Sequence, residues 1–187
     1  MECRFELKIP QERIAVVIGK NGETKKELET EAKCNIEVNS KEGDIIITGE
    51  DAVTLYSLKE VITAIGRGFS PETAQQLFKQ DYVLEVIALN DFLKNKNQMA
   101  RIKGRVIGAN GRARVTLEEL TETNITVYGK TISIIGQIEK VALSKRAVES
   151  LLAGSLHRTV YKWLEKQRRM MRMATLNQEW QSREEEK

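Results

Sequence analysis

The sequence has few of the residues from which metal sites and covalent active sites are built. Its 187 residues include two cysteines, Cys3 and Cys34, and a single histidine, His157. Structural zinc needs about four such ligands close together, so we expect no metal site, and no other cofactor. A lone histidine offers no pair of nucleophile and base, and no GxxxxGK[ST] nucleotide-binding segment is present. We therefore predict a protein that is not an enzyme.

Long apolar runs and aromatic side chains are scarce as well. No run approaches the ~18 apolar residues needed to span a bilayer, and the N-terminus alternates like a strand instead of carrying a signal peptide's apolar core. We expect a cytoplasmic protein without membrane contact, whose cysteines are ordinary thiols in a reducing compartment. Aromatic residues make up 5 % and the net charge is +3. Any nucleic-acid surface must therefore come from local placement of Lys and Arg, without an aromatic stacking platform.

What the sequence does contain is a repeat, with VIGKNG at residues 17–22 and VIGANG at residues 106–111. When the copies are aligned at a shift of 89 residues, ten of the 22 positions from 17 to 38 are identical. Ordinary amino-acid usage gives roughly one or two identities by chance. The identities beyond the glycine segment are Leu28/Leu117, Glu29/Glu118, Asn35/Asn124, Ile36/Ile125 and Val38/Val127. A whole structural unit is therefore duplicated.

Both copies show the same order of predicted elements. In the first copy, the patterns predict a strand at 3–9, a short helix ending at Gly19, a helix after Gly22, strands at 35–38 and 44–48, and a helix at 51–66. The second copy repeats this order from 82 to 153, with a polar insertion at 90–98 and a hairpin turn shorter by two residues. We predict two α+β domains, each a three-stranded antiparallel sheet covered on one face by three helices.

The repeat also predicts the domain boundaries. We expect the first domain at 1–68, a packed connecting helix at 69–81, the second domain at 82–154, and a basic C-terminal helix with its tail at 155–187. Helical spacing in the last segment runs from Leu156 to about Ala174. Its cations are Arg158, Lys162, Lys166, Arg168, Arg169 and Arg172. They form either a solvated helix face or an RNA contact. The six positive side chains against the one carboxylate of Glu165 favour RNA contact.

The glycines of the repeated segment lie at a sharp turn between two helices. Glycine accepts positive φ values and lets a bulky group approach the main chain. The helix that follows presents unpaired N–H groups and the positive end of its dipole, which favour a phosphate. Lys20 and Lys25 add positive charge in the first copy, and Arg112 and Arg114 do so in the second. A sugar-phosphate backbone is the predicted ligand, and the alternative is a plain turn between helices with no ligand.

With IGKNG and IGANG in this order of elements, the sequence resembles the type I KH domain, whose signature is IGxxG. The resemblance implies that each GxxG loop clamps the backbone of about four unpaired nucleotides while the bases lie in an apolar groove. The implied contacts in the first copy are Gly19, Lys20, Asn21, Gly22 and Lys25, with Val17, Ile18 and Ile36 in the groove. In the second copy they are Lys103, Arg105, Gly108, Ala109, Asn110, Gly111, Arg112 and Arg114, with Val106, Ile107 and Ile125 in the groove.

The two copies differ in charge around the loop. The first has Lys20 inside the loop but Glu23 directly after it, where a carboxylate competes with a phosphate for the helix N-terminus. The second has the neutral Ala109 in the loop and a denser surround of cations. We therefore hypothesise that the second copy binds RNA more strongly.

The stretch KGRVIGANGR at 103–112, with the helix, hairpin and basic tail after it, resembles the Partner-of-Nob-one ribosome assembly factors. The intact VIGKNG of the first copy favours their archaeal form. The resemblance implies non-catalytic binding of single-stranded RNA in the 3′ region of small-subunit ribosomal RNA during ribosome biogenesis. It also implies two partners, a Nob-one type endonuclease and the α subunit of archaeal initiation factor two. The competing interpretation is a protein-interaction scaffold in which the KH folds dock a nuclease or translation factor.

Overall fold

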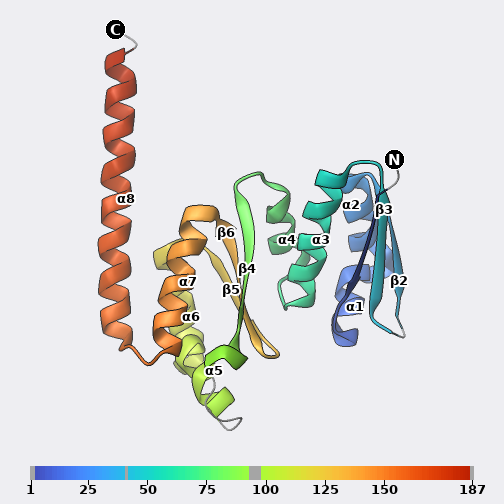
Figure 1. Cartoon of the computed structure of the whole chain (residues 1–187), viewed down its shortest axis with the longest axis horizontal. Helices are drawn as coiled ribbons and strands as arrows, with labels where there is room; N and C mark the ends of the chain where they lie inside the picture. Colours follow the sequence, from blue (N-terminus) through green and yellow to red (C-terminus); the bar gives the residue numbers. More distant parts are fainter. Residues whose placement is uncertain (1–2, 41, 93–97, 186–187) are drawn as a thin grey trace.

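The computed structural model describes residues 3–40, 42–92 and 98–185, which form two similar α+β domains followed by a long helix (Figure 1). The predicted fold class is confirmed in both domains. Each has its three strands in one antiparallel sheet, with the last strand of the domain in the centre. In the described part of the chain, no helix combines the length and the apolar content required to cross a lipid bilayer.

The first domain has the predicted order of elements. They are β1 (Cys3–Lys8), α1 (Gln11–Ile18), η1 (Lys20–Gly22), α2 (Glu23–Ala32), β2 (Cys34–Asn39), β3 (Asp44–Gly49) and α3 (Ala52–Gly66). Asp51 caps α3 by accepting a hydrogen bond of 3.0 Å from the backbone N–H of Val53. The helices cover one face of the sheet, and Leu28, Ile47 and Leu58 are fully buried between them. The strand β2 is left at an edge of the sheet, beside α2.

The second domain repeats this arrangement. Its elements are β4 (Tyr82–Ala88), η3 (Leu89–Phe92), α5 (Met99–Ile107), η5 (Ala109–Gly111), α6 (Arg112–Thr121), β5 (Asn124–Tyr128), β6 (Thr131–Gln137) and α7 (Ile138–Leu152). The hairpin turn between β5 and β6 contains only Gly129 and Lys130, so the predicted shorter turn is confirmed. Part of the polar insertion predicted at 90–98, namely 93–97, lies outside the described residues.

The second sheet differs from the prediction because both of its faces are covered. One face packs on α5, α6 and α7, and the other faces the connecting segment, which consists of α4 (Pro71–Ala74) and η2 (Gln75–Phe78). Ile135 on this second face is fully buried in the core of the first domain. The side chains of Gln76 and Asn124 are joined by a hydrogen bond of 3.4 Å, and that of Tyr128 donates to Glu12. In Figure 1, α3 and α4 lie between the two sheets.

The C-terminal helix α8 (His157–Glu185) is longer than predicted, since the apolar spacing ended near Ala174. Val160 and Leu164 are buried against α6 and α7, so the first part of the helix belongs to the second domain. The remainder extends beyond the N-terminal start of α7, because α8 begins near the end of α7 and runs in the opposite direction (Figure 1).

Candidate RNA-binding site

The two glycine loops have almost the same backbone conformation. The first glycine has φ 75° and ψ 176° at Gly19 and φ 74° and ψ 176° at Gly108. The asparagines, which follow two residues later, are left-handed at φ 54° for Asn21 and φ 52° for Asn110. Asparagine tolerates this region better than most residues because its short side chain interacts with the nearby backbone. The repeated sequence therefore specifies one loop geometry twice.

The two glycines of each loop are required for different reasons. A Cβ at Gly108 would lie 2.6 Å from the Cβ of Ala113, and one at Gly19 would lie 2.7 Å from the backbone nitrogen of Thr24. The first glycine therefore allows close packing of the turn on the following helix. Gly22 and Gly111 have φ values of 79° and 75°, but no atom lies within 4 Å of a Cβ placed on either. The space above the second glycine is open, so a large group can approach the main chain there.

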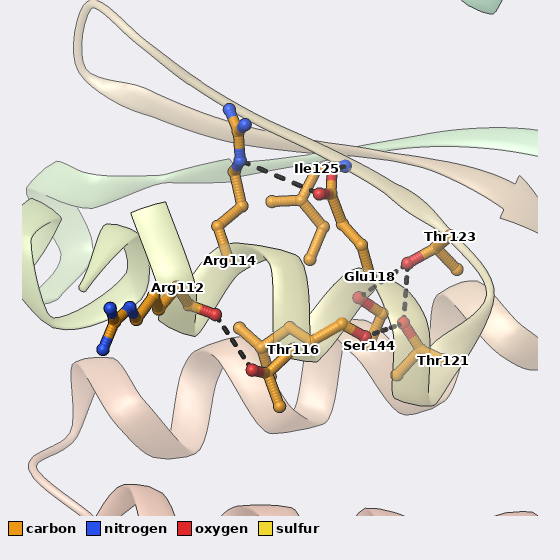
Figure 2. A network of polar contacts seen from close by, with 9 residues as sticks. Arg112, Arg114, Thr116, Glu118, Thr121, Thr123, Ile125 and Ser144 are labelled. Carbon is orange, nitrogen blue, oxygen red and sulfur yellow. Dashed lines mark hydrogen bonds and ion pairs between the residues drawn. The ribbon is translucent and has the colours of Figure 1, made fainter. Parts of the chain in front are cut away.

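Charged side chains surround both loops but differ in how they are engaged. Lys20 and Asn21 are exposed in the first loop, as are Ala109 and Asn110 in the second. Arg112, at the start of α6, is exposed, and Figure 2 shows its side chain pointing away from the polar contacts of that helix. The corresponding position at the start of α2 is Glu23, also exposed. The start of α6 therefore carries a positive side chain, and that of α2 a negative one.

Two further predicted contacts, Lys25 and Arg114, lie near carboxylates. Lys25 Nζ is 3.6 Å from Glu29 Oε1, and Arg114 Nε is 3.8 Å from Glu118 Oε2 (Figure 2). Both pairs are one helical turn apart and partly exposed, so each is worth only a few tenths of a kcal/mol, about 0.3–0.5. An arriving phosphate can compete for these cations at little cost.

The same two carboxylates hold the edge strands in place. Glu29 accepts a hydrogen bond of 2.9 Å from the backbone N–H of Ile36, and Glu118 accepts one of 2.7 Å from that of Ile125. Sequence reasoning noted the identity of Glu29 and Glu118 but assigned them no role. Burial, followed by the negative charge of Glu29, raises the pKa of the nearby Cys34 thiol to about 11. Each carboxylate thus fixes the spacing between a loop-bearing helix and the neighbouring strand.

The apolar groove is narrower than the sequence suggests. Ile36 and Ile125 are only 0 % and 3 % exposed, and Val17 and Val106 are fully buried. These four side chains pack in the two cores and have no surface to offer a base, because helical and strand spacing direct them inward. Ile18 and Ile107, directly before the loops, are half-buried and remain accessible. The accessible apolar side chain beside each loop is therefore a single isoleucine.

Arg105 also has a structural role that the sequence did not reveal. Its Nε donates to the main-chain oxygen of Leu151 at 2.8 Å, and its Nη2 donates to that of Ser155 at 2.6 Å. These carbonyls lie at the end of α7, so the guanidinium caps that helix. Because its guanidinium is bound there, Arg105 is not available for the RNA contact predicted from the sequence. Lys103, on the same helix, is half-buried and forms no ion pair with the other described residues.

No group of three or more His, Cys, Asp or Glu side chains within the described ranges is arranged to hold a metal ion. The features shared by the two copies are the open glycine loop, the exposed helix start and the adjacent isoleucine. This arrangement can hold an anionic chain through backbone N–H groups and contact an attached apolar ring.

Comparison with known proteins agrees with this geometry. Residues 4–67 match the KH domain model, and residues 83–169 match the model for the second KH domain of PNO1, described as a eukaryotic type KH-domain of type I. The chain is 42 % identical over 172 residues to KH domain-containing protein MJ0443 of Methanocaldococcus jannaschii, covering 90 % of this chain and 75 % of that protein. It is 31 % identical over 116 residues to RNA-binding protein pno-1 of Caenorhabditis elegans, covering 60 % of this chain but only 42 % of that protein.

A solved structure resembles nearly the whole chain. A chain in the crystal structure of the a/eIF2alpha-aDim2p-rRNA complex from Pyrococcus horikoshii OT3 superposes with a TM-score of 0.85 at 40 % identity. The match covers 90 % of this chain and 95 % of that one. The resemblance to the Partner-of-Nob-one factors is confirmed by these relatives. The chain belongs to the family of tandem KH-domain proteins to which MJ0443 and PNO1 belong.

Proposed function

We propose that this protein binds single-stranded RNA through both GxxG loops, without catalysing a reaction, in the 3′ region of small-subunit ribosomal RNA during ribosome biogenesis. The observation that carries the proposal is the open space above Gly22 and Gly111, each at the start of a helix. A phosphate fits such a position because backbone N–H groups and the helix dipole both stabilise negative charge.

The proposed contacts follow from the accessible residues. Gly19–Gly22 and Gly108–Gly111 hold the sugar-phosphate backbone, and Ile18 and Ile107 contact the bases. Lys20 and Arg112 are the exposed cations closest in sequence to the loops, while Lys25 and Arg114 exchange their carboxylate partners for phosphates. Each loop holds about four nucleotides. Because the second sheet packs against the first domain, the two loops are held on one body, and linkage raises their combined affinity.

We propose that the second loop binds RNA more strongly than the first, although fewer cations support this ranking than the sequence suggested. Arg105 is engaged at the end of α7 and does not contribute the free charge that we expected, and Arg114 must first leave Glu118. Two differences remain: Arg112 replaces Glu23 at the helix start, and Ala109 replaces Lys20 inside the loop, so the second copy is more positive by one charge. Reversing the charge at a helix N-terminus changes its interaction with a phosphate directly.

The RNA class and the protein partners are supported by the relatives. The Pyrococcus horikoshii structure is a complex of a/eIF2alpha, aDim2p and rRNA, and its likeness extends over 90 % of this chain. We propose rRNA and the α subunit of archaeal initiation factor two as partners of this protein. A Nob-one type endonuclease is proposed from the family resemblance alone. A scaffold that binds only proteins is less favoured, because it would not require two open glycine loops with the same conformation.

Crosslinking in cells, followed by sequencing of the bound RNA, tests this proposal. We expect enrichment of the 3′ region of small-subunit ribosomal RNA, and loss of that enrichment in the Ala109→Asp/Asn110→Asp variant. Protein partners recovered with the variant should be retained. Crosslinks spread over messenger RNA without small-subunit enrichment would overturn the ribosomal assignment, and crosslinks unaffected by the variant would overturn the role of the second loop.

A further inference from the structure

The exposed face of α8 carries a row of cations that the two loops do not use. Arg158, Lys162, Lys166 and Arg169 are all exposed and recur at spacings of three or four residues, which places them on one side of a helix. Val160 and Leu164, which pack on the second domain, lie on the opposite side. With a rise of 1.5 Å per residue, the row is about 16 Å long.

The row begins at the end of the domain where the second loop lies. His157, the first residue of α8, has Nε2 2.7 Å from the main-chain oxygen of Arg105, and Gly108 follows Arg105 by three positions. Further along, Arg168 of α8 lies 3.7 Å from Glu122 at the end of α6. The helix α6, which starts at the loop, therefore runs in the same direction as α8. A strand leaving the loop can continue along the row.

On the packed side of α8, Arg168 has a carboxylate partner, Glu122, whereas the cations of the row lie apart from it. Glu122 lies beside both Lys140 and Arg168, at 2.5 Å and 3.7 Å. Within the described ranges, none of the four side chains in the row forms an ion pair. Only Glu165 interrupts them, so four cations less one carboxylate leave a local charge of +3, equal to that of the entire protein.

We propose that Arg158, Lys162, Lys166 and Arg169 bind the phosphates of an RNA strand as it leaves the second GxxG loop. This inference rests on the proposed function and adds a third contact surface to it. RNA fits the row better than a protein, because protein interfaces need a core from which Lys is depleted, whereas no apolar side chain separates these cations. The exposed Met170, Met173 and Leu176 lie farther toward the C-terminus. Phosphate binding needs only charge at regular intervals, and gains free energy by releasing counterions.

The test compares two variants of equal charge change in the full chain, with the first loop disabled by Lys20→Asp and Asn21→Asp so that only the second loop binds. The row variant carries Lys162→Gln and Lys166→Gln, and the control carries Arg4→Gln and Lys130→Gln, at exposed sites on the first sheet and on the β5–β6 turn. Each is titrated with a single-stranded RNA of about four nucleotides, which fills one loop, and with one of about twelve. Glutamine preserves helix propensity, so α8 should remain folded.

We expect the row variant to bind the longer RNA about tenfold more weakly, with the slope of log affinity against log salt smaller by about 1.4, since each lost phosphate contact removes about 0.7. The short RNA and the control variant should show no change. Unchanged affinity and slope with the longer RNA, or an equal loss in the control, would overturn the proposal. Equal affinity of the protein with an intact row for the short and the longer RNA would also overturn it. If Ala109→Asp/Asn110→Asp leaves binding of the short RNA intact, the function proposed for the loop fails instead.

Discussion

The guanidinium Nε of Arg105 donates a hydrogen bond of 2.8 Å to the main-chain oxygen of Leu151, and the first domain contains an equivalent contact. There, Arg13 Nε donates to the main-chain oxygen of Ile65 at 2.9 Å, and its Nη2 donates to that of Phe69 at 2.6 Å. The two arginines lie at positions that do not align in the repeat, yet both secure the end of the last helix in their domain to the helix before the loop. In each domain, therefore, an arginine of the helix before the loop binds the end of the last helix, but from a different position in the repeat.

Arg105→Ala should lower the free energy of unfolding by about 2 kcal/mol, because it removes charged donors from carbonyls at the end of α7. Urea denaturation followed by circular dichroism measures the change. Arg101→Ala is the matched control, since Arg101 is exposed on the same helix. RNA affinity of the folded Arg105→Ala variant should stay close to that of the wild type. A large loss of affinity without loss of stability would show that Arg105 contacts RNA after all.

Glu118→Gln should strengthen RNA binding. The glutamine oxygen can still accept the hydrogen bond from Ile125, but Arg114 loses its carboxylate partner and becomes free for a phosphate. We expect affinity to rise about two- to fivefold at low salt, and stability to fall by about 1 kcal/mol because a charged acceptor is lost. Glu119→Gln removes the same charge from an exposed neighbouring site and controls for the general effect. Equal gains from both substitutions would rule out a specific release of Arg114.

Alanine in place of each loop glycine should separate packing from ligand access. Gly108→Ala brings a Cβ within 2.6 Å of Ala113, whereas Gly111→Ala meets nothing within 4 Å. Gly111 is left-handed at ψ 4°, where alanine costs about 1–2 kcal/mol. Gly108, at ψ 176°, has a conformation that essentially only glycine adopts, so with its close contact Gly108→Ala should lose roughly 1 kcal/mol more. Gly111→Ala should nevertheless weaken RNA binding, since its methyl group occupies the open approach. Thermal unfolding and fluorescence anisotropy measure the two effects, and wild-type affinity for Gly111→Ala would contradict the proposed approach of the phosphate.

The Cys34 thiol should be unreactive at moderate pH. Because burial and then Glu29 raise its pKa to about 11, only about one molecule in a thousand carries the thiolate at pH 8. Iodoacetamide labelling, read by peptide mass spectrometry, should be slow at pH 8 and accelerate as the pH approaches 11. Unfolding in urea should restore ordinary reactivity at pH 8. Rapid labelling of Cys34 in the folded protein at pH 8 would contradict the raised pKa.

Local sequence signals predicted the fold and both loops. The repeated VIG and NG residues specify a helix end and a left-handed turn, and these depend only on neighbouring residues. Arg105 could not be assigned in the same way, because its acceptors are 46 and 50 positions away. The burial of Ile36 and Ile125 likewise depends on how closely the helices pack on the edge strands.

The covered second sheet was predictable in part. Residues 131–136 of β6 are all buried, and their sequence TISIIG contains two adjacent apolar residues, Ile134 and Ile135. In a half-exposed strand, apolar and polar residues would alternate instead. Such a run is typical of a strand covered on both faces. Which element covers it could not be read from the sequence, because the connecting segment reaches that face only through tertiary packing. The role of Glu29 and Glu118 had a signal too, since both survive in the repeat outside the glycine loop.

The contribution of the two loops can be ranked with single substitutions that match in geometry and charge. Asn21→Asp and Asn110→Asp each add one negative charge at nearly the same backbone conformation, φ 54° and φ 52°, which aspartate tolerates. Greater loss of RNA affinity from Asn110→Asp would support the second loop as the stronger site, whereas greater loss from Asn21→Asp would refute that ranking.

The most direct measurement is the affinity of the full chain for a single-stranded RNA of about eight nucleotides from the 3′ region of small-subunit ribosomal RNA, before and after Ala109→Asp/Asn110→Asp. The two aspartates repel the phosphate from an exposed loop without entering the core. We predict at least a roughly tenfold loss of affinity, equivalent to about 1.4 kcal/mol, with an unchanged melting temperature. Wild-type affinity in this variant, with the fold intact, would contradict RNA binding at the second GxxG loop.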